Sequence, residues 1–115
     1  MKICKRCIQP DTRPGIYFDE NGICGACLWE EEKKIIDWDL REKELYDIAE
    51  WAKGQKRGTY DCVIGVSGGK DSTRQAIVAR DLLGLRCLLV NCEPEGITDI
   101  GRKNIENLKN LGFDI

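Results

Sequence analysis

A polar, glycine-containing loop sits between two segments of different periodicity, and this arrangement constrains the fold more than any other feature. Residues 60–66 form a short apolar run, which is typical of a strand buried on both faces. The loop Ser67-Gly68-Gly69-Lys70-Asp71-Ser72 follows, and residues 71–83 then place apolar side chains at helical spacing up to Gly84. A buried strand that enters a helix through glycines predicts one strand–loop–helix unit of a parallel sheet.

The same alternation continues towards the end of the chain. Residues 86–90 form a second apolar strand, and residues 98–111 form a second amphipathic segment that Gly112 closes. Residues 113–115 then have the composition of a third strand at its beginning. Strands that alternate with helices predict an α/β fold with a Rossmann-like parallel sheet and crossover helices.

The loop itself has the composition of a phosphate-binding site. Glycines let backbone amides approach an anion closely, and the helix that follows directs its free N–H groups at the loop. Ser67 and Ser72 add two hydroxyl groups. The loop is not a Walker A motif, because Asp71 follows Lys70 where that motif has Ser or Thr. The dinucleotide fingerprint also fails, since Ser67 occupies its second glycine position. The alternative is a tight turn that binds no ligand.

Two cysteine pairs near the N-terminus predict a metal site. Cys4 and Cys7 form one Cys-x2-Cys pair, Cys24 and Cys27 form another, and sixteen residues separate the pairs. This spacing is typical of a structural zinc site with four thiolate ligands. Between the pairs, apolar residues flank Asn21-Gly22, a hairpin signal that would bring the pairs together. The alternatives are two reduced pairs or a redox pair.

These signals divide the chain into three parts. Residues 1–38 form the zinc-binding module, including a helix predicted from residue 28. Residues 39–58 hold a second helix, with Asp39 as its predicted N-terminal cap, and most of a polar linker over residues 55–59. Residues 59–115 hold the strand–helix repeats.

Charge and hydropathy exclude several classes of function. Residues 1–58 carry 11 basic and 12 acidic side chains, and residues 59–115 carry 7 and 8, so no basic block is present. We therefore do not expect nucleic acid as the main partner, because phosphate contacts need clustered Lys or Arg. No apolar run has membrane-spanning length, and no apolar segment of a signal peptide follows the first residues. We therefore expect a cytoplasmic protein.

The motifs together resemble one enzyme family. Ser-Gly-Gly-x-Asp-Ser is similar to the loop of the ATP pyrophosphatase, or PP-loop, superfamily. The opening Cys-Lys-Arg-Cys-Ile-Gln-Pro-Asp-Thr-Arg-Pro-Gly-Ile, the second pair Cys24-Gly-Ala-Cys27 and the segment from Tyr60 to Ser72 resemble the N-acetyl sugar amidotransferases of surface-polysaccharide biosynthesis. The resemblance spans nearly the whole chain.

The resemblance implies a nucleotide site around the loop. We expect ATP and Mg²⁺ there, with zinc in a structural role at the cysteines. The candidate catalytic residues are Ser67, Asp71 and Ser72. The candidate nucleotide-binding residues are Ile64, Gly65, Val66, Ser67, Gly68, Gly69, Lys70, Asp71, Ser72 and Asn91. Cys92 follows Asn91 at the carboxyl end of a strand and is a candidate lining residue.

The family also implies a reaction and partners. ATP adenylylates the acetamido oxygen of an N-acetyl sugar, and ammonia then displaces AMP to give an acetamidino sugar for lipopolysaccharide O-antigen or a related surface glycan. A glutaminase subunit would supply the ammonia, and a cyclase-like subunit would channel it. Members of the family are longer than this chain. We therefore expect residues 1–115 to be the N-terminal part of such an enzyme and to be inactive alone.

Two other functions remain open at the level of sequence. The first is a tRNA-thiolating enzyme of the same superfamily, which can also carry a cysteine zinc module. The second is a zinc module that serves as a non-catalytic adaptor for other proteins. ATP binding would distinguish the enzymes from the adaptor.

Overall fold

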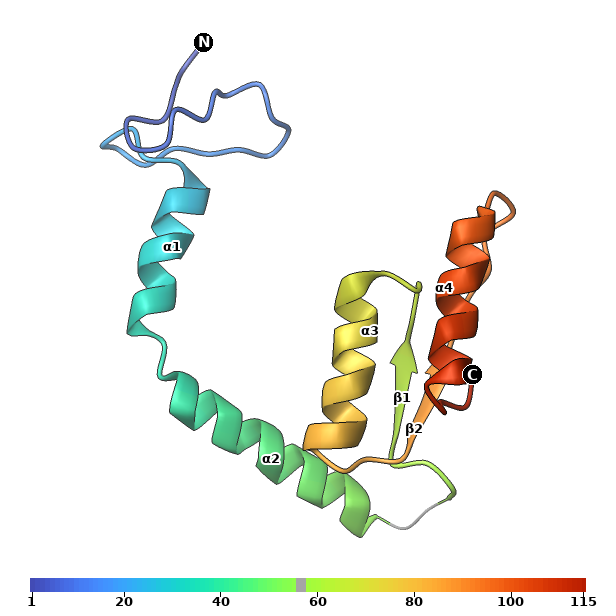
Figure 1. The fold of residues 1–115 in the computed structure, drawn as a ribbon. Coiled ribbons are helices and arrows are strands. Elements are labelled where there is room, and N and C mark those ends of the chain that lie inside the picture. The colour runs from blue at the N-terminus through green and yellow to red at the C-terminus, as the bar shows by residue number, and fades with distance from the viewer. Residues whose placement is uncertain (56–57) are drawn as a thin grey trace. The chain divides into compact units, whose positions relative to one another are not determined.

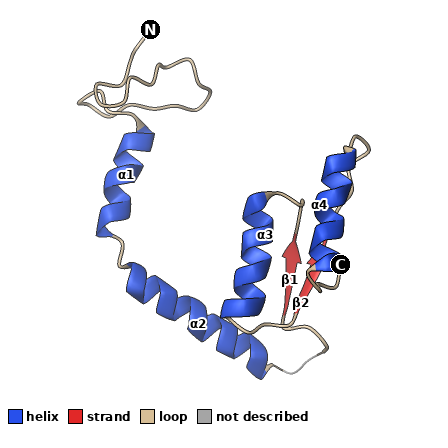
Figure 2. Cartoon of the chain, viewed as in Figure 1, coloured by secondary structure: helices blue, strands red, loops and turns tan. Residues whose placement is uncertain are grey.

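The computed structural model describes residues 1–55 and 58–115. Part of the predicted linker at residues 55–59 therefore lies outside the described residues. The chain divides into two compact units, Met1–Leu40 and Arg41–Ile115. Figure 1 follows the chain through both units, and Figure 2 marks its helices, strands and loops. Each unit is described by itself.

The first unit begins with loops that short backbone bridges hold together. An antiparallel bridge pairs Ile3 with Pro10, and a second pairs Phe18 with Cys24. Between Phe18 and Cys24, the Asp19 carboxylate accepts hydrogen bonds from the backbone N–H groups of Asn21 and Ile23, at 3.0 and 2.7 Å. The predicted hairpin is thus a tight turn closed by one bridge, and an aspartate side chain supports it.

The helices that follow begin earlier than the sequence predicts. Helix α1 spans Gly25–Ile35 and helix α2 spans Trp38–Gly54. The Asp37 carboxylate accepts a hydrogen bond of 2.9 Å from the backbone N–H of Leu40, so Asp37 caps α2. The prediction that Asp39 caps this helix is wrong, because Asp39 already lies in its first turn.

The second unit has the predicted alternation of strands and helices. Its elements are β1 (Cys62–Gly65), α3 (Lys70–Ile77), the π-helix η1 (Val78–Leu82), β2 (Cys87–Val90) and α4 (Asp99–Asn110). Strands β1 and β2 are parallel, with Cys62 opposite Cys87, and Figure 1 shows them side by side. Asp114 extends the sheet by a parallel bridge to Leu88. Among the described residues the fold is therefore α/β, with four α-helices and a parallel sheet of two strands, which confirms this part of the predicted fold class.

The helix predicted at residues 71–83 changes character halfway. After Ile77 the backbone widens into η1, where the N–H of Leu83 donates to the carbonyl of Val78 at 3.0 Å. A π-turn holds one more residue than an α-turn. Ala79 within η1 and Leu83 directly after it are both buried. Gly84 then closes the helix with a φ of +67°, a value that favours glycine.

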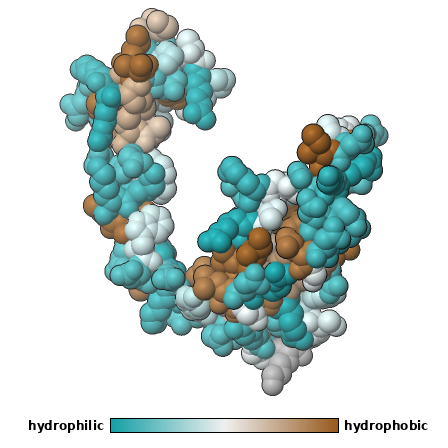
Figure 3. All heavy atoms as spheres, viewed as in Figure 1, coloured by the Kyte–Doolittle hydropathy of each residue, from teal (hydrophilic) through white to brown (hydrophobic). Residues whose placement is uncertain are grey.

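The core of the second unit lies on one face of the sheet. Cys87 and Leu89 of β2 point into it, and the other members of the cluster are Ala49, Val66, Ala76, Ala79, Leu83, Leu85, Leu108 and Phe113. The opposite face is open: Val63 is 66% exposed and Val90 is 50% exposed. The prediction that both strands are buried on both faces is therefore wrong for this structure. Figure 3 shows apolar side chains at the surface of this unit.

None of the helices within residues 1–55 and 58–115 combines the length and the hydrophobicity needed to cross a bilayer.

Candidate functional site

The four predicted metal ligands lie together in the first unit. The sulfur atoms of Cys4, Cys7, Cys24 and Cys27 all lie within 4.8 Å of one another. Cys7 Sγ and Cys24 Sγ are 3.5 Å apart. Tetrahedral zinc with Zn–S bonds of about 2.3 Å places its sulfur ligands roughly 3.8 Å from one another. The cluster therefore has the ligand type, number and spacing of a four-thiolate metal site.

The local backbone explains how each pair reaches the cluster. In the first pair the chain turns back after Cys7, where Ile8 has a φ of +60°, and the N–H of Ile8 donates to the carbonyl of Cys4 at 3.1 Å. The second pair lies at the start of α1: Cys24 is the residue before the helix, and Cys27 is in its first turn. The second pair thus lies at the start of a helix, and its two sulfur atoms meet those of the first pair there.

A hydrogen bond between backbones fixes the two pairs relative to each other. The N–H of Lys5, within the first pair, donates to the carbonyl of Gly22, just before the second pair, at 3.1 Å. Gly22 has a φ of +80°, and a Cβ there would lie 3.2 Å from the Lys5 side chain. The flexible Lys5 side chain can move away from such a Cβ, so the positive φ is the feature that favours glycine at position 22.

Hydrogen bonds to sulfur prepare Cys4 for metal binding. Burial of the Cys4 side chain opposes ionisation, but backbone N–H donors, the strongest from Cys24, more than offset it and lower the pKa of the thiol from 9.0 to about 6. The N–H groups of Cys24 and Arg6 lie 3.2 and 3.4 Å from Cys4 Sγ. A thiolate held by N–H groups is a ready metal ligand.

The pKa of the Cys27 thiol shifts the opposite way to that of Cys4. Its hydrogen bond with the Cys7 thiol, and then its burial, raise the pKa of the Cys27 thiol from 9.0 to about 12. Four adjacent thiols cannot all ionise without a cation, because each thiolate repels the next. A divalent ion at the centre removes this repulsion, so the residues fit a metal that thiolates bind well, such as zinc.

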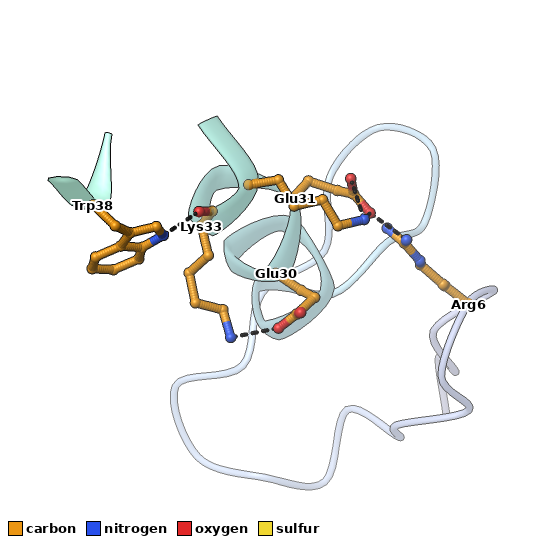
Figure 4. A network of polar contacts seen from close by, with 6 residues as sticks. Arg6, Glu30, Glu31, Lys33 and Trp38 are labelled. Carbon is orange, nitrogen blue, oxygen red and sulfur yellow. Dashed lines mark hydrogen bonds and ion pairs between the residues drawn. The ribbon is translucent and has the colours of Figure 1, made fainter. Parts of the chain in front are cut away.

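A network of charged side chains connects the first cysteine pair to α1. Arg6, from the first cysteine pair, forms an ion pair with Glu31, and Glu31 also accepts from Lys34 at 3.0 Å. Figure 4 shows this network, together with Lys33, which pairs with Glu30 and accepts at its carbonyl from the Trp38 indole. These exposed pairs link the first cysteine pair to α1, but such pairs contribute little to stability.

The predicted phosphate loop lies between β1 and α3 in the second unit. Gly68 has a φ of +77°, and Gly69 precedes the first turn of α3 in an extended conformation. The Ser72 hydroxyl oxygen accepts from the N–H of Ser67, and the Ser67 hydroxyl oxygen accepts from the N–H of Gly69, each at 3.3 Å. Both serines thus stabilise the loop as well as lining it.

Helix α4 packs directly against this loop. A Cβ at Gly68 would lie 3.0 Å from Asn104 Cβ and 3.4 Å from the backbone nitrogen of Ile105. Glycine is therefore required twice at position 68, by its left-handed backbone and by the space that α4 leaves. A groove of about 210 Å³ runs between α3 and α4 here, and Gly68, Lys70 and Asn104 are among its lining residues.

A larger cavity opens on the other side of the loop. It measures about 580 Å³ and lies at the carboxyl ends of β1 and β2, where α/β sheets bind ligands. The predicted residues that line it are Gly65, Val66, Ser67, Ser72, Asn91 and Cys92. The Asn91 amide also donates to the carbonyl of Val66 at 2.7 Å, which ties the two strands together at the cavity.

The other predicted nucleotide residues lie outside that lining. Ile64 packs against the core, and Gly68 and Lys70 line the groove towards α4. Lys70 and Asp71 are highly exposed and pair with each other at 2.6 Å. Gly69, before the first turn of α3, is at neither surface opening.

Sequence reasoning missed part of the cavity wall. Pro94, Ile97 and Gly101 line it from the segment between β2 and α4 and from the first turn of α4. The sequence could have indicated this segment as part of the cavity, because it follows the carboxyl end of a predicted strand, where ligand-binding loops occur. The exact positions could not be derived, since they depend on the path of the loop.

No family model matches the chain, and no curated protein matches it. The functional assignment therefore depends on its own residues and their geometry.

Proposed function

We propose that the chain is the nucleotide-binding part of an ATP-dependent, AMP-forming amidotransferase with a Rossmann-like PP-loop domain. One observation supports this most strongly. The segment from Ser67 to Ser72 runs into the first turn of α3, and its two serines line a cavity of about 580 Å³ at the carboxyl ends of two parallel strands. That position suits a nucleotide, whose phosphates would lie on the loop and whose adenosine would lie over the strand ends.

The loop residues have distinct roles in this proposal. The free N–H groups in the first turn of α3 and the hydroxyl groups of Ser67 and Ser72 hold the β- and γ-phosphates. Asp71, whose side chain is 84% exposed, faces solvent at the start of α3, where it can hold Mg²⁺ through water. The magnesium ion, when bound, neutralises charge on the pyrophosphate that leaves.

The proposed acceptor is an N-acetyl sugar, on the strength of the resemblance. The acetamido oxygen attacks the α-phosphorus, the bond to the β-phosphate oxygen breaks, and pyrophosphate leaves. Ammonia then adds to the activated carbon and AMP leaves, which gives an acetamidino sugar. A glutaminase and a cyclase-like subunit are the proposed ammonia source and channel, and the cytoplasm is the proposed compartment.

The cysteine cluster is proposed to hold a structural zinc ion. All four coordination positions would be filled by protein, so no position remains for a substrate or an activated water. The cluster would therefore maintain the fold of the first unit and take no part in the transfer reaction.

Binding of MgATP, measured by calorimetry on the zinc-loaded chain, tests the proposal. We expect weak but specific binding that Gly69→Val abolishes, because a branched side chain would obstruct the loop beside Ser67 Oγ, 3.3 Å from a Cβ. Gly54→Val, at the open end of α2, is the matched control and should bind as the original chain does.

Two outcomes would contradict the proposal. The first is an unsubstituted chain that binds no MgATP, which would favour the adaptor function. The second is a Gly69→Val chain with unchanged affinity, which would place the nucleotide elsewhere. Tight binding of total tRNA in a filter assay would instead favour the thiolating enzymes.

A further inference from the structure

Two cysteines outside the metal cluster are in contact across the sheet. Cys62 of β1 and Cys87 of β2 are direct partners in the parallel register, and their sulfur atoms lie 3.5 Å apart. Both side chains belong to the face of the sheet that the helices cover: Cys87 is buried in the core, and Cys62 packs against it while remaining partly open to solvent. We propose that Cys62 and Cys87 form a reversible disulfide under oxidation, which locks β1 to β2. This inference does not depend on the proposed ATP site.

The backbone already satisfies the requirements of such a bond. Neighbouring strands lie about 4.7–4.9 Å apart, which is inside the range of about 4.4–6.8 Å between Cα atoms of disulfide-bonded residues. The register between Cys62 and Cys87 places the two Cα atoms directly opposite each other. The sulfur atoms must move from 3.5 Å to the bonding distance of about 2.05 Å, which rotation of the two side chains can supply.

The two thiols have different parts in the reaction. Cys62 is partly exposed, so an oxidant reaches it first, whereas Cys87 is buried and its thiol donates a weak hydrogen bond of 3.4 Å to the Leu85 carbonyl. Hydrogen peroxide converts the Cys62 thiol to a sulfenic acid and releases one water. The Cys87 sulfur then attacks the Cys62 sulfur, the S–O bond breaks, and the oxygen leaves as a second water with the Cys87 proton. The sum is two thiols and one peroxide to one disulfide and two waters.

The remaining cysteines of the chain do not compete for this pair. Four of them form the metal cluster of the first unit. Cys92 is exposed beyond the carboxyl end of β2, whereas Cys87 is the first residue of that strand. Because each strand residue advances the chain by about 3.3 Å, Cys92 lies too far along to replace Cys87 as the partner of Cys62.

The bond would close a covalent ring around the glycine loop. The ring would run from Cys62 through the loop, α3 and η1 to Cys87. At the other end of the strands, the N–H of Val66 already donates to the carbonyl of Val90 at 2.9 Å, and the Asn91 amide bonds Val66 at 2.7 Å. The disulfide would add a covalent link at the amino ends of the strands, where the Asp61 carboxylate already pairs with Arg86 at 2.6 Å, and a ring of this size restricts the unfolded chain strongly.

Peptide mapping of the zinc-loaded chain tests this directly. Trypsin releases Cys62 in residues 58–70 and Cys87 in residues 87–102, a peptide that also contains Cys92. The experiment therefore uses the Cys92→Ser chain, with hydrogen peroxide as oxidant and dithiothreitol as reductant. We expect the two peptides joined with the loss of two hydrogens, and released again on reduction.

Thermal unfolding supplies the second measurement. Oxidation should raise the temperature at which half of the second unit is unfolded by about 5–15 °C, and reduction should reverse this rise. Cys62→Ser in the same background removes the bond while keeping a side chain of similar size, and its midpoint should not respond to peroxide. The proposal is overturned if the peptides remain separate after oxidation, if Cys62 joins a metal-cluster cysteine instead, or if the cross-link forms and lowers the midpoint.

Discussion

The two units of the chain bury different kinds of residue. Of residues 1–40, all of which the structure describes, only Cys4 and Cys24 are buried, and helix α1 buries no side chain. In Arg41–Ile115 the buried residues form one apolar cluster that includes Leu83, Leu89 and Leu108. A unit of this small size without an apolar core needs a metal or a covalent bond to fold. The comparison supports the proposal that a metal ion, when bound by the four cysteines, stabilises the first unit, whereas hydrophobic burial stabilises the second.

The largest effect is expected from removing a buried metal ligand. Cys24→Ser should abolish metal binding and unfold the first unit, because structural zinc contributes about 10–16 kcal/mol of apparent binding free energy in small modules. The amide resonances of the second unit should remain unchanged. Cys92→Ser, which removes an exposed thiol outside the cluster, is the matched control and should retain one zinc per chain by elemental analysis.

That comparison fails if the first unit keeps its dispersed amide resonances without metal. It also fails if the unsubstituted chain, purified without added metal, contains no zinc and all four thiols react freely.

Shortening a core side chain should have the opposite effect: it should destabilise the second unit and leave the first unit unchanged. Leu89 is 1% exposed, and Leu89→Ala should destabilise the second unit by about 2–5 kcal/mol through lost burial and a cavity. Zinc affinity, measured by competition with a chelator, should not change. Val63→Ala on the open face of the same sheet is the control, since Val63 is 66% exposed and should cost much less. Equal losses at both positions would mean that the open face is covered in solution.

Glycines in the two units should respond differently to the same substitution. Gly68→Ala should cost about 1–3 kcal/mol, because its φ of +77° is strained for alanine and α4 leaves little space. Gly25→Ala would place its Cβ 2.4 Å from the Tyr17 ring, but this ring is 60% exposed and can swing outward. We therefore expect Gly25→Ala to shift Tyr17 resonances with little change in zinc affinity. A larger loss of stability from Gly25→Ala than from Gly68→Ala would contradict this expectation.

The smallest effect concerns acid stability of the second unit. Hydrogen bonds from the Arg86 side chain, and then its backbone N–H, lower the pKa of the Asp61 carboxyl from 3.8 to about 2. Because the folded pKa is the lower one, this contribution is complete above about pH 4 and disappears as the pH falls towards 2. Asp61→Asn should remove it and flatten that part of the stability profile.

Acid also releases metal from thiolates, so the pH experiment must follow probes in the second unit alone. The resonances of Leu89 and Phe113 serve this purpose, since both residues are buried in its core. If the stability of the Asp61→Asn chain still falls as steeply between about pH 4 and 2, carboxyl groups other than Asp61 are responsible for the loss of stability in acid.

Much of the candidate metal site could be predicted from local spacing. Cys-x2-Cys pairs bind metal on tight turns, so the ligand set follows from short-range sequence. The hydrogen bond between Lys5 and Gly22 and the burial of Cys4 could not be derived, because they depend on how the two turns meet. The start of α1 was also missed, since the metal-binding turn and the helix share Cys24 and the residues after it.

The strand–loop–helix order of the second unit was determined by the sequence itself. Apolar runs, helical spacing and glycines at positions 68 and 84 specify local backbone, and local backbone is what a sequence pattern records. Only the tertiary structure decided which face of the sheet is covered, that Cys62 meets Cys87, and that Pro94 and Ile97 complete the cavity. Those features depend on contacts between residues far apart in the chain, which arise only when helices and strands pack and which no local pattern encodes.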